Sequence, residues 1–221
     1  MPIAIVLRTT RTKSVYRDSI ISTIATGAGN RALICSGFYQ ENFKGSLYQA
    51  SLEPGLAAAL VKHGVQLDTV GIHNGTWKPS YINFCNNLIG AGVTLVPYLM
   101  AGFQWHAKVF LLKHFGNPIF GIVGSSNFTA NAFGVSNVPA LATDSPFPTA
   151  KFNFECDVYF WNAANALISA AMNNLINQDL IREQVFLTQY DDRENLNRSI
   201  EVRLLEIEQQ IWASGGIQTL F

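Results

Sequence analysis

Short apolar runs alternate with amphipathic helical patterns over the first hundred residues, and this alternation is what most constrains the fold. The apolar runs predict strands at 31–36, 66–72 and 93–99. The helical patterns between and before them predict helices at 19–26, 54–62 and 79–89. Strands that alternate with helices in this way are typical of βαβ units, in which helices cover a parallel sheet. We therefore predict an α/β fold with a mixed, largely parallel sheet flanked by helices.

The second half of the chain follows a different pattern. Further apolar runs predict strands at 105–113, 119–123 and 154–161. The first two flank the segment His-Phe-Gly-Asn-Pro at 114–118, whose composition is typical of a turn, so we expect a β-hairpin. Residues 135–151 contain three prolines and predict a long loop. Helical patterns at 162–177 and 193–213 predict C-terminal helices.

Charge and composition exclude several classes of protein. Fifteen basic and fifteen acidic residues cancel, so no global field attracts the chain to nucleic acid or to anionic lipid. Nearly half of the residues are hydrophobic, which excludes intrinsic disorder, and no apolar run reaches the roughly 18 residues that a membrane span needs. Cys35, Cys85 and Cys156 are odd in number and widely spaced, which predicts buried free thiols in a reducing compartment. We therefore expect a cytoplasmic protein.

The segment that carries chemistry is His106-Ala107-Lys108, followed by Gly124-Ser125-Ser126-Asn127. In a strand, residues i and i+2 project from the same face, so His106 and Lys108 point together. If the second strand of the hairpin pairs back on the first, Ser125 and Asn127 emerge near this pair. An imidazole, an ammonium, a hydroxyl and a carboxamide then converge on one spot.

This set of groups suits a phosphodiester. The imidazole of His106 is able to attack phosphorus, while Lys108 and Asn127 donate hydrogen bonds to the equatorial oxygens. Such chemistry requires neither a metal ion nor a cofactor.

These residues resemble the phospholipase D superfamily, whose hallmark is a His-x-Lys followed downstream by a Gly-Ser-x-Asn. The match continues to Glu155, at the place where members often have a glutamate that orients the catalytic histidine. The resemblance implies a phospholipase D-like fold in which His106, Lys108, Ser125, Asn127 and Glu155 are catalytic. It also implies that Gly124 and Ser126 contribute to binding the substrate.

The chain departs from the family pattern at the hairpin turn. Members often have an aspartate five positions after the lysine, where this chain has Lys113. The spacing between the lysine and the glycine is also about four residues longer than is usual in the family. Both departures lie away from the strand ends where the chemistry is expected, so they affect the choice of subfamily more than that of the class.

A single His-x-Lys motif has a consequence for assembly. Family members need two such motifs, one histidine as the nucleophile and the other to protonate the leaving oxygen. His63, His73 and His114 do not begin a second motif. The resemblance therefore implies a homodimer with one site across its two-fold axis. Because small one-motif members are nucleases, it also implies DNA as the substrate and a covalent phosphohistidine as the intermediate.

We divide the chain after the last predicted strand. Residues 1–161 are expected to form the phospholipase D-like catalytic domain, and residues 162–221 a C-terminal helical extension. Apolar residues recur along the second predicted helix at Leu196, Ile200, Leu204, Ile207 and Ile211. This stripe packs either on the core of the same domain or at a dimer interface, and the pattern leaves both open.

Alternatives stay open at several levels. The chain is either a nuclease, a phospholipid-acting enzyme of the same superfamily, or an inactive scaffold or binding subunit, which Lys113 favours. Glu155 either serves the site or is an ordinary strand residue paired with a basic side chain, and Asp157 is a second candidate for its role. Ser125 either takes part in catalysis or ends the strand by bonding backbone. With no recognition domain evident, specificity resides in loops or in a partner such as a helicase or a methyltransferase.

Two further groups of residues have a structural and a functional interpretation. Arg8, Arg11 and Lys13 either contact phosphates or belong to a solvated N-terminal arm. The aromatic residues after the first predicted strand, Phe38, Tyr39 and Phe43, either stack on bases or pack in the core.

Overall fold

The computed structural model describes residues 2–8, 14–72, 75–101, 108–133 and 154–221. The strands are β1 Pro2–Arg8, β2 Arg31–Ser36, β3 Gln66–Ile72, β4 Leu95–Met100, β5 Lys108–His114, β6 Asn117–Gly124, β7 Glu155–Trp161, β8 Val185–Gln189 and β9 Ile217–Thr219. The α-helices are α1 Val15–Ala25, α2 Leu56–Lys62, α3 Lys78–Gly90, α4 Ala130–Phe133, α5 Ala166–Ile176, α6 Asp179–Arg182 and α7 Ile200–Ala213. Short 3-10 helices lie at Phe43–Gly45, Ala50–Leu52 and Arg193–Asn195.

The described strands form one mixed sheet in the order β8-β1-β7-β6-β5-β2-β3-β4-β9. Pairing is parallel between β2 and β3 and between β3 and β4. Every other described pair is antiparallel. The expected α/β class with a mixed sheet is therefore confirmed, but the expectation that the sheet is largely parallel is wrong. The βαβ units supply only the three strands β2, β3 and β4. The hairpin strands β5 and β6 pair antiparallel with each other and with their outer neighbours β2 and β7.

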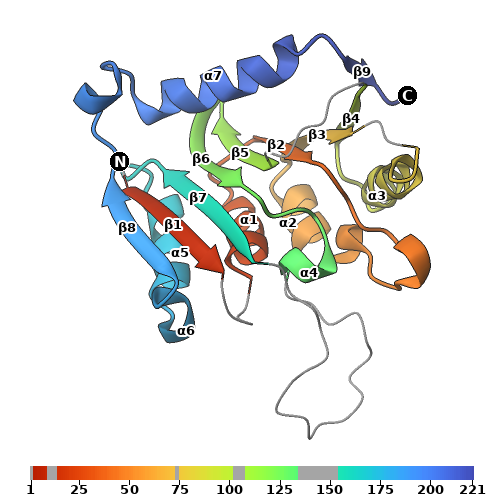
Figure 1. The fold of residues 1–221 in the computed structure, drawn as a ribbon, viewed down its shortest axis with the longest axis horizontal. Coiled ribbons are helices and arrows are strands. Elements are labelled where there is room, and N and C mark those ends of the chain that lie inside the picture. Colours follow the sequence, from red (N-terminus) through yellow and green to blue (C-terminus); the bar gives the residue numbers. More distant parts are fainter. Residues whose placement is uncertain (1, 9–13, 73–74, 102–107, 134–153) are drawn as a thin grey trace, which may run out of the picture.

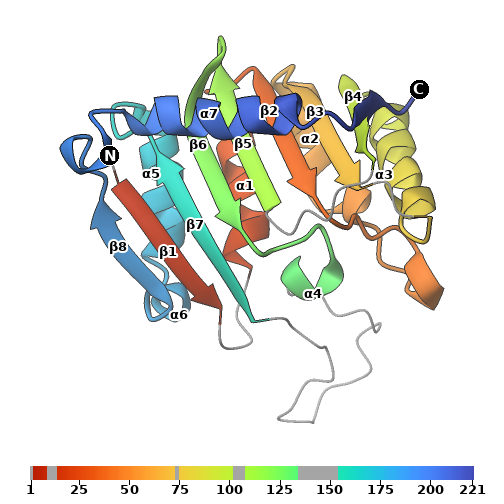
Figure 2. The ribbon, with the colours of Figure 1, turned by 45° about the horizontal axis from the view of Figure 1, so that its top comes forward.

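Helices cover both faces of the sheet (Figures 1 and 2). On one face, α1, α2, α3 and α5 pack on a large apolar core that includes Ile34, Phe110 and Tyr159. On the other face, α7 crosses the sheet and packs through Leu204 and Ile211 on a smaller core. Because alternate residues of a strand face opposite ways, each central strand contributes to both cores.

Most predicted elements lie where the pattern placed them. Strands β2 and β3 have the expected bounds, and β5 and β6 form the expected hairpin. Strands β1, β8 and β9 were not predicted. Strand β1 lies between β7 and β8, and β8 and β9 form the two edges of the sheet. The segment after Trp161 thus supplies two edge strands as well as helices.

The last helix is shorter than predicted. It begins at Ile200, where the Ser199 hydroxyl accepts a hydrogen bond from the Val202 amide at 3.4 Å. Leu196 and Asn197 have positive φ angles of 61° and 54°, a left-handed conformation that interrupts a right-handed helix. Leu196 is consequently exposed, while the remaining stripe packs on the chain's own sheet.

The cysteines follow the prediction in part. Cys35 and Cys85 are buried free thiols, but Cys156 is exposed. Burial raises the pKa of the Cys35 thiol well above its usual value. Among the helices of the described residues, none combines the length and the apolar character that crossing a bilayer requires.

Lys113, which departs from the family pattern, has a structural role. Strand alternation turns its side chain toward α7, where the ammonium forms a buried ion pair with Glu208. The Trp212 indole nitrogen also donates to the Glu208 carboxylate, at 3.2 Å. Lys108 is an odd number of residues away on β5, so its side chain lies on the opposite face of the sheet. The departure therefore concerns the attachment of α7.

We expect Lys113→Ala to lower the free energy of unfolding by about 3–5 kcal/mol, because it leaves the Glu208 carboxylate buried without a cation. The control is the double variant Lys113→Met/Glu208→Leu, which removes both charges at similar volume and is expected to unfold within about 1.5 kcal/mol of the wild type. Urea denaturation measures both. Equal losses in the two variants would show that packing, and not the charge pair, holds α7.

Candidate active site

The predicted chemistry lies along one edge of the sheet, where several strands begin or end. The register pairs Cys35 of β2 with Val109 of β5, and Lys108 of β5 with Gly124 of β6. Gly124 in turn pairs with Asp157 of β7. The carboxyl ends of β2 and β6 and the amino ends of β5 and β7 therefore meet at this edge, close to α4 (Figure 2).

Lys108 opens β5 and is buried, with its side chain on the same face as Phe110 and the large core. Within the described part of the chain, no hydrogen bond or ion pair engages its ammonium. Burial lowers the pKa of Lys108, and the nearby carboxylates of Glu155 and Asp157 oppose that shift. The site thus holds a desolvated ammonium that is available to an anion.

The turn from Gly124 to Ser126 is held by Asp157. One carboxylate oxygen accepts from the amides of Ser125 and Ser126 at 3.0 and 3.1 Å. The other oxygen accepts from the Ser126 hydroxyl at 2.5 Å. Burial raises the pKa of Asp157, while these hydrogen bonds oppose the shift. The carboxylate therefore shapes the Gly-Ser-Ser turn.

The same carboxylate explains the glycine of the motif. A Cβ at position 124 would collide with the Asp157 carboxylate and would lie 2.7 Å from the carbonyl oxygen of Cys156. No side chain fits at that point. Glycine is therefore required at position 124 by packing, and the buried Ser126 hydroxyl stabilises the turn through its hydrogen bond to Asp157.

Ser125 and Glu155 are bound to each other. The Ser125 hydroxyl donates to the Oε2 atom of Glu155 at 2.5 Å and accepts from the amide of Cys156 at 3.0 Å. Both interpretations of Ser125 thus describe part of its environment, since it bonds backbone and also a carboxylate of the predicted site. Glu155 is buried, and the charge of its carboxylate opposes the lowering of the Lys108 pKa by burial.

Asn127 is oriented by the end of β2. Its Oδ1 atom accepts from the amide of Phe38 at 3.1 Å and from the hydroxyl of Ser36 at 3.2 Å. An amide N–H only donates, so this oxygen assignment is fixed by chemistry and the Nδ2 group points elsewhere. Among described residues Nδ2 has no partner. The carboxamide is thus held with a free donor.

Ser36 is the residue that sequence reasoning missed. It follows Cys35, the partner of Val109, and therefore lies beside Lys108 across the two strands. The carbonyl oxygen of Phe38 lies 3.0 Å from the Ser36 hydroxyl and shares its single proton with Asn127 Oδ1. A serine at the carboxyl end of a buried strand was the available signal, because polar residues at such strand ends collect at one edge of a sheet.

Arg8 has a structural role. Its Nη1 atom donates to the carbonyl oxygens of Asn131 and Ala132 at 2.8 and 2.7 Å, and the Ser14 hydroxyl donates to Ala132 at 2.9 Å. Arg8 is buried, so the interpretation of a solvated arm is wrong for this residue. These contacts hold α4 against the strand edge.

Several predicted residues lie outside the described residues. These are His106, His73, Arg11 and Lys13, together with the predicted loop 135–151. The structure brings together the other predicted site residues, which are Lys108, Gly124, Ser125, Ser126, Asn127 and Glu155. Of these, Ser126 is buried with its hydroxyl on Asp157 and so is turned away from solvent.

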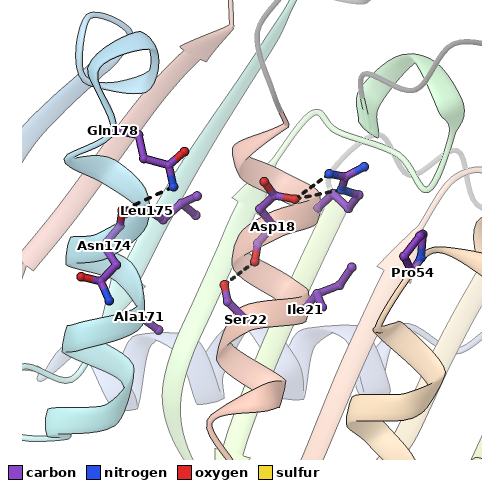
Figure 3. Close-up of a pocket in the computed structure, with 9 residues that line it drawn as sticks. Asp18, Ile21, Ser22, Pro54, Ala171, Asn174, Leu175 and Gln178 are labelled. Atoms are coloured by element: carbon purple, nitrogen blue, oxygen red, sulfur yellow. Dashed lines mark hydrogen bonds and ion pairs between the residues drawn. The ribbon is translucent and has the colours of Figure 1, made fainter.

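A cavity of about 420 Å³ lies elsewhere, between α1 and α5 (Figure 3). Asn174 approaches it from α5 and Gln178 from the turn between α5 and α6, while Asp18 and Ser22 approach it from α1. Arg17 at its rim pairs with Asp18 at 2.8 Å. None of the converging site residues lines this cavity, so it is separate from the strand edge.

Comparisons with known proteins agree with the motif. Residues 69–177 match the family model of the NgoFVII restriction endonuclease N-terminal PLD domain, a range that contains all of the predicted site residues. The resemblance to the phospholipase D superfamily is thereby confirmed. No curated protein sequence matches the chain.

Solved structures that match this chain include a phospholipase D family member, Nuc from Salmonella typhimurium, at 18% identity and a TM-score of 0.46, covering 86% of this chain and 100% of Nuc. TrmBL2, an archaeal chromatin protein, has 12% identity and a TM-score of 0.33, with 84% of this chain and 53% of TrmBL2 covered. Yeast tyrosyl-DNA phosphodiesterase has 13% identity and a TM-score of 0.34, with 71% and 31% covered.

We expect Asp157→Ala to lower the free energy of unfolding by about 3 kcal/mol or more, because two amides and a hydroxyl lose their buried acceptor. Asp157→Asn is the matched control. Its Oδ1 atom still accepts from both amides, and its Nδ2 group donates to the Ser126 hydroxyl, so a much smaller loss is expected. Denaturant unfolding of both variants tests this, and an equal loss would contradict the role of the carboxylate as acceptor.

Proposed function

We propose, on the premise that residues 69–177 form a phospholipase D-type domain, that this chain is a DNA-cleaving phosphodiesterase that works without a metal ion. The observation that carries the proposal is that the buried Lys108 ammonium and the oriented Asn127 carboxamide lie at the same edge of the sheet. Both groups present donors that are not used by described residues. A phosphate diester supplies the anionic oxygens that such donors bind.

In the proposed reaction, an imidazole nitrogen of His106 attacks phosphorus and forms an N–P bond. The P–O bond to the leaving strand breaks, and His106 of a second copy donates a proton to the departing oxygen. The same histidine of the second copy then takes a proton from water. That water attacks phosphorus and breaks the N–P bond, which releases the phosphomonoester. Lys108 and Asn127 hold the non-bridging oxygens throughout.

Glu155 is proposed to orient the histidine. Its Oε2 atom accepts from Ser125, which holds the carboxylate in place at the amino end of β7. The described hydrogen bonds leave Oε1 without a donor. A carboxylate held in this way accepts a ring N–H and selects one imidazole tautomer. Ser125 then acts through Glu155, as a positioning residue.

A homodimer completes the proposed site, and an apolar face of the sheet suits the interface. Beyond α7, strands β8, β1 and β7 extend with this face uncovered by helices (Figure 2). The face carries Ile3, Ile5 and Leu7 of β1, with Phe186 of β8 paired to Ile5. Leu7 and Phe186 are 36% and 59% exposed. An uncovered apolar patch of this kind is typical of a protein interface.

The apolar face adjoins the strand edge that holds the site. Leu7 precedes Arg8, which pairs with Glu155, and the exposed Cys156 follows Glu155 on the neighbouring strand. A second copy docked on this face would therefore lie next to the site. A helicase or methyltransferase partner stays a prediction.

The first test of the function is cleavage of plasmid and single-stranded DNA in excess EDTA. Wild type is expected to cut, and His106→Ala to be inactive. Asn127→Ala is expected to be slower by about 10²–10³-fold, because one donor to the phosphate is removed. Lys108→Ala is likewise expected to be slower, because the phosphate loses the ammonium. Lys62→Ala, on α2 away from the edge, is its matched lysine control and is expected to cut normally.

Cleavage by His106→Ala at the wild-type rate would overturn the nucleophile. Cleavage that appears only with added magnesium would overturn the metal-independent mechanism. Hydrolysis of phospholipid vesicles without any cleavage of DNA would show that the substrate is a phospholipid and not DNA.

The dimer is tested by two neighbouring substitutions on β8. Phe186→Glu places a charge on the apolar face, and we expect a monomer by sedimentation and the loss of DNA cleavage. Leu187→Glu changes the next residue, which is 62% exposed and projects from the other face, so we expect it to stay a dimer. A wild-type protein that sediments as a monomer would contradict the proposed assembly.

A further inference from the structure

Three aromatic side chains from two separate segments meet beside the site. Phe38 and Phe43 come from the loop after β2, and Trp77 from the start of α3. The ring centroids of Phe38 and Phe43 are 4.8 Å apart, and those of Phe38 and Trp77 are 5.6 Å apart. All three are partly exposed, and Trp77 is 36% exposed. We refer to these three residues as the aromatic cluster.

Tyr39, the neighbour of Phe38, behaves differently. It is fully buried, and its hydroxyl donates to the carbonyl oxygens of Ile34 and Val70 at 3.0 and 3.1 Å. The two interpretations of the predicted aromatic group therefore apply to different members. Tyr39 packs in the core, while Phe38 and Phe43 lie at the surface together with Trp77.

The aromatic cluster is joined to the site through backbone. The amide of Phe38 donates to the Oδ1 atom of Asn127, and the carbonyl oxygen of Phe38 accepts from the amide of Phe128 at 3.2 Å. The backbone of Phe38, whose ring contacts those of Phe43 and Trp77, is therefore fixed next to the carboxamide that is proposed to bind the phosphate. In a nucleic acid strand, each base is likewise attached close to its phosphate.

The loop that carries Phe43 is anchored by a buried carboxylate. Glu41 accepts from the amide and the hydroxyl of Ser51 at 2.6 and 3.0 Å, and from Asn87 of α3 at 3.0 Å. The Glu41 amide itself donates to the hydroxyl oxygen of Ser80, another residue of α3, at 2.8 Å. The loop and α3 are thus fastened together, which keeps Phe43 and Trp77 in position.

Cations accompany the aromatic rings. The Lys44 ammonium lies 5.4 Å from the centroid of the Phe43 ring, and Lys78 follows Trp77 in the chain. Lys44 is exposed and has a φ of 50°, a left-handed conformation that is uncommon for lysine. Exposed aromatic rings with adjacent cations provide stacking for bases and charge for phosphates, which is how single strands are commonly bound.

We propose that the aromatic cluster stacks on an unpaired base of the substrate strand, next to the phosphate held by Lys108 and Asn127. This proposal rests on the proposed function and extends it to the form of the substrate. Bases inside a duplex are already stacked, so the cluster selects single-stranded DNA or a nucleotide turned out of the helix. Stacking on an aromatic ring tolerates any base, so this contact favours unpaired strands without selecting a sequence.

The experiment compares binding of oligothymidine with that of an abasic strand of equal length and charge, by fluorescence anisotropy in EDTA. A His106→Ala background prevents cleavage during the measurement. The protein with its aromatic cluster unchanged is expected to bind oligothymidine about tenfold more tightly than the abasic strand, which is the size of effect that stacking of one base gives. Trp77→Ala and Phe43→Ala are each expected to abolish most of this preference, while Trp77→Phe keeps it.

Phe115→Ala is the matched control. Phe115 is 77% exposed and lies in the β5–β6 turn, at the other end of the strands from the site, so its removal is expected to leave the preference intact. Equal affinity for the two strands would overturn the stacking contact while leaving the nuclease proposal standing. Binding of neither strand, together with no cleavage by wild type, would overturn both. Binding of phosphatidylcholine vesicles alone, lost in Trp77→Ala, would reassign the cluster to acyl chains.

Discussion

The carboxylate of Asp157 determines the geometry on which the whole site depends. It accepts from two successive amides and a hydroxyl of the Gly-Ser-Ser turn, and its position leaves no room for a side chain at Gly124. The turn brings Ser125 onto Glu155 and delivers Asn127 to the end of β2. Because the carboxylate is buried, its charge is costly, and the three donors are what make that burial acceptable. In the proposed function, Asp157 thus supports chemistry that other residues perform.

The two faces of the sheet have separate tasks. One face holds the large core under α1, α2, α3 and α5, and it carries Lys108, Glu155 and Asp157 where that core reaches the strand edge. The other face receives α7, which Lys113 and Glu208 attach by a buried ion pair, and its uncovered part is the proposed dimer interface. Alternation along β5 separates the two lysines by face, so that Lys108 is placed for its proposed role of binding phosphate while Lys113 holds a helix.

The proposed site extends along the strand edge in both directions from Lys108. On one side lie Glu155 and Ser125, suited to orienting a histidine. On the other side lie Ser36, Asn127 and the aromatic cluster, suited to holding a phosphate and the base attached to it. Net charge is zero, so binding of nucleic acid in this arrangement depends on a few placed groups and on stacking, and not on a general positive field.

The sequence by itself determined the α/β class, the bounds of β2 and β3, the hairpin and the motif from Lys108 to Asn127, because periodicity and short spacings are local properties of a chain. It did not determine the largely antiparallel order of the strands, since β1, β8 and β9 find their partners only across long distances in sequence. Nor did it assign Asp157, Ser36 or Lys113 their partners. Each of those contacts joins segments more than 30 residues apart, and only the tertiary structure decides which polar groups meet when such segments pack.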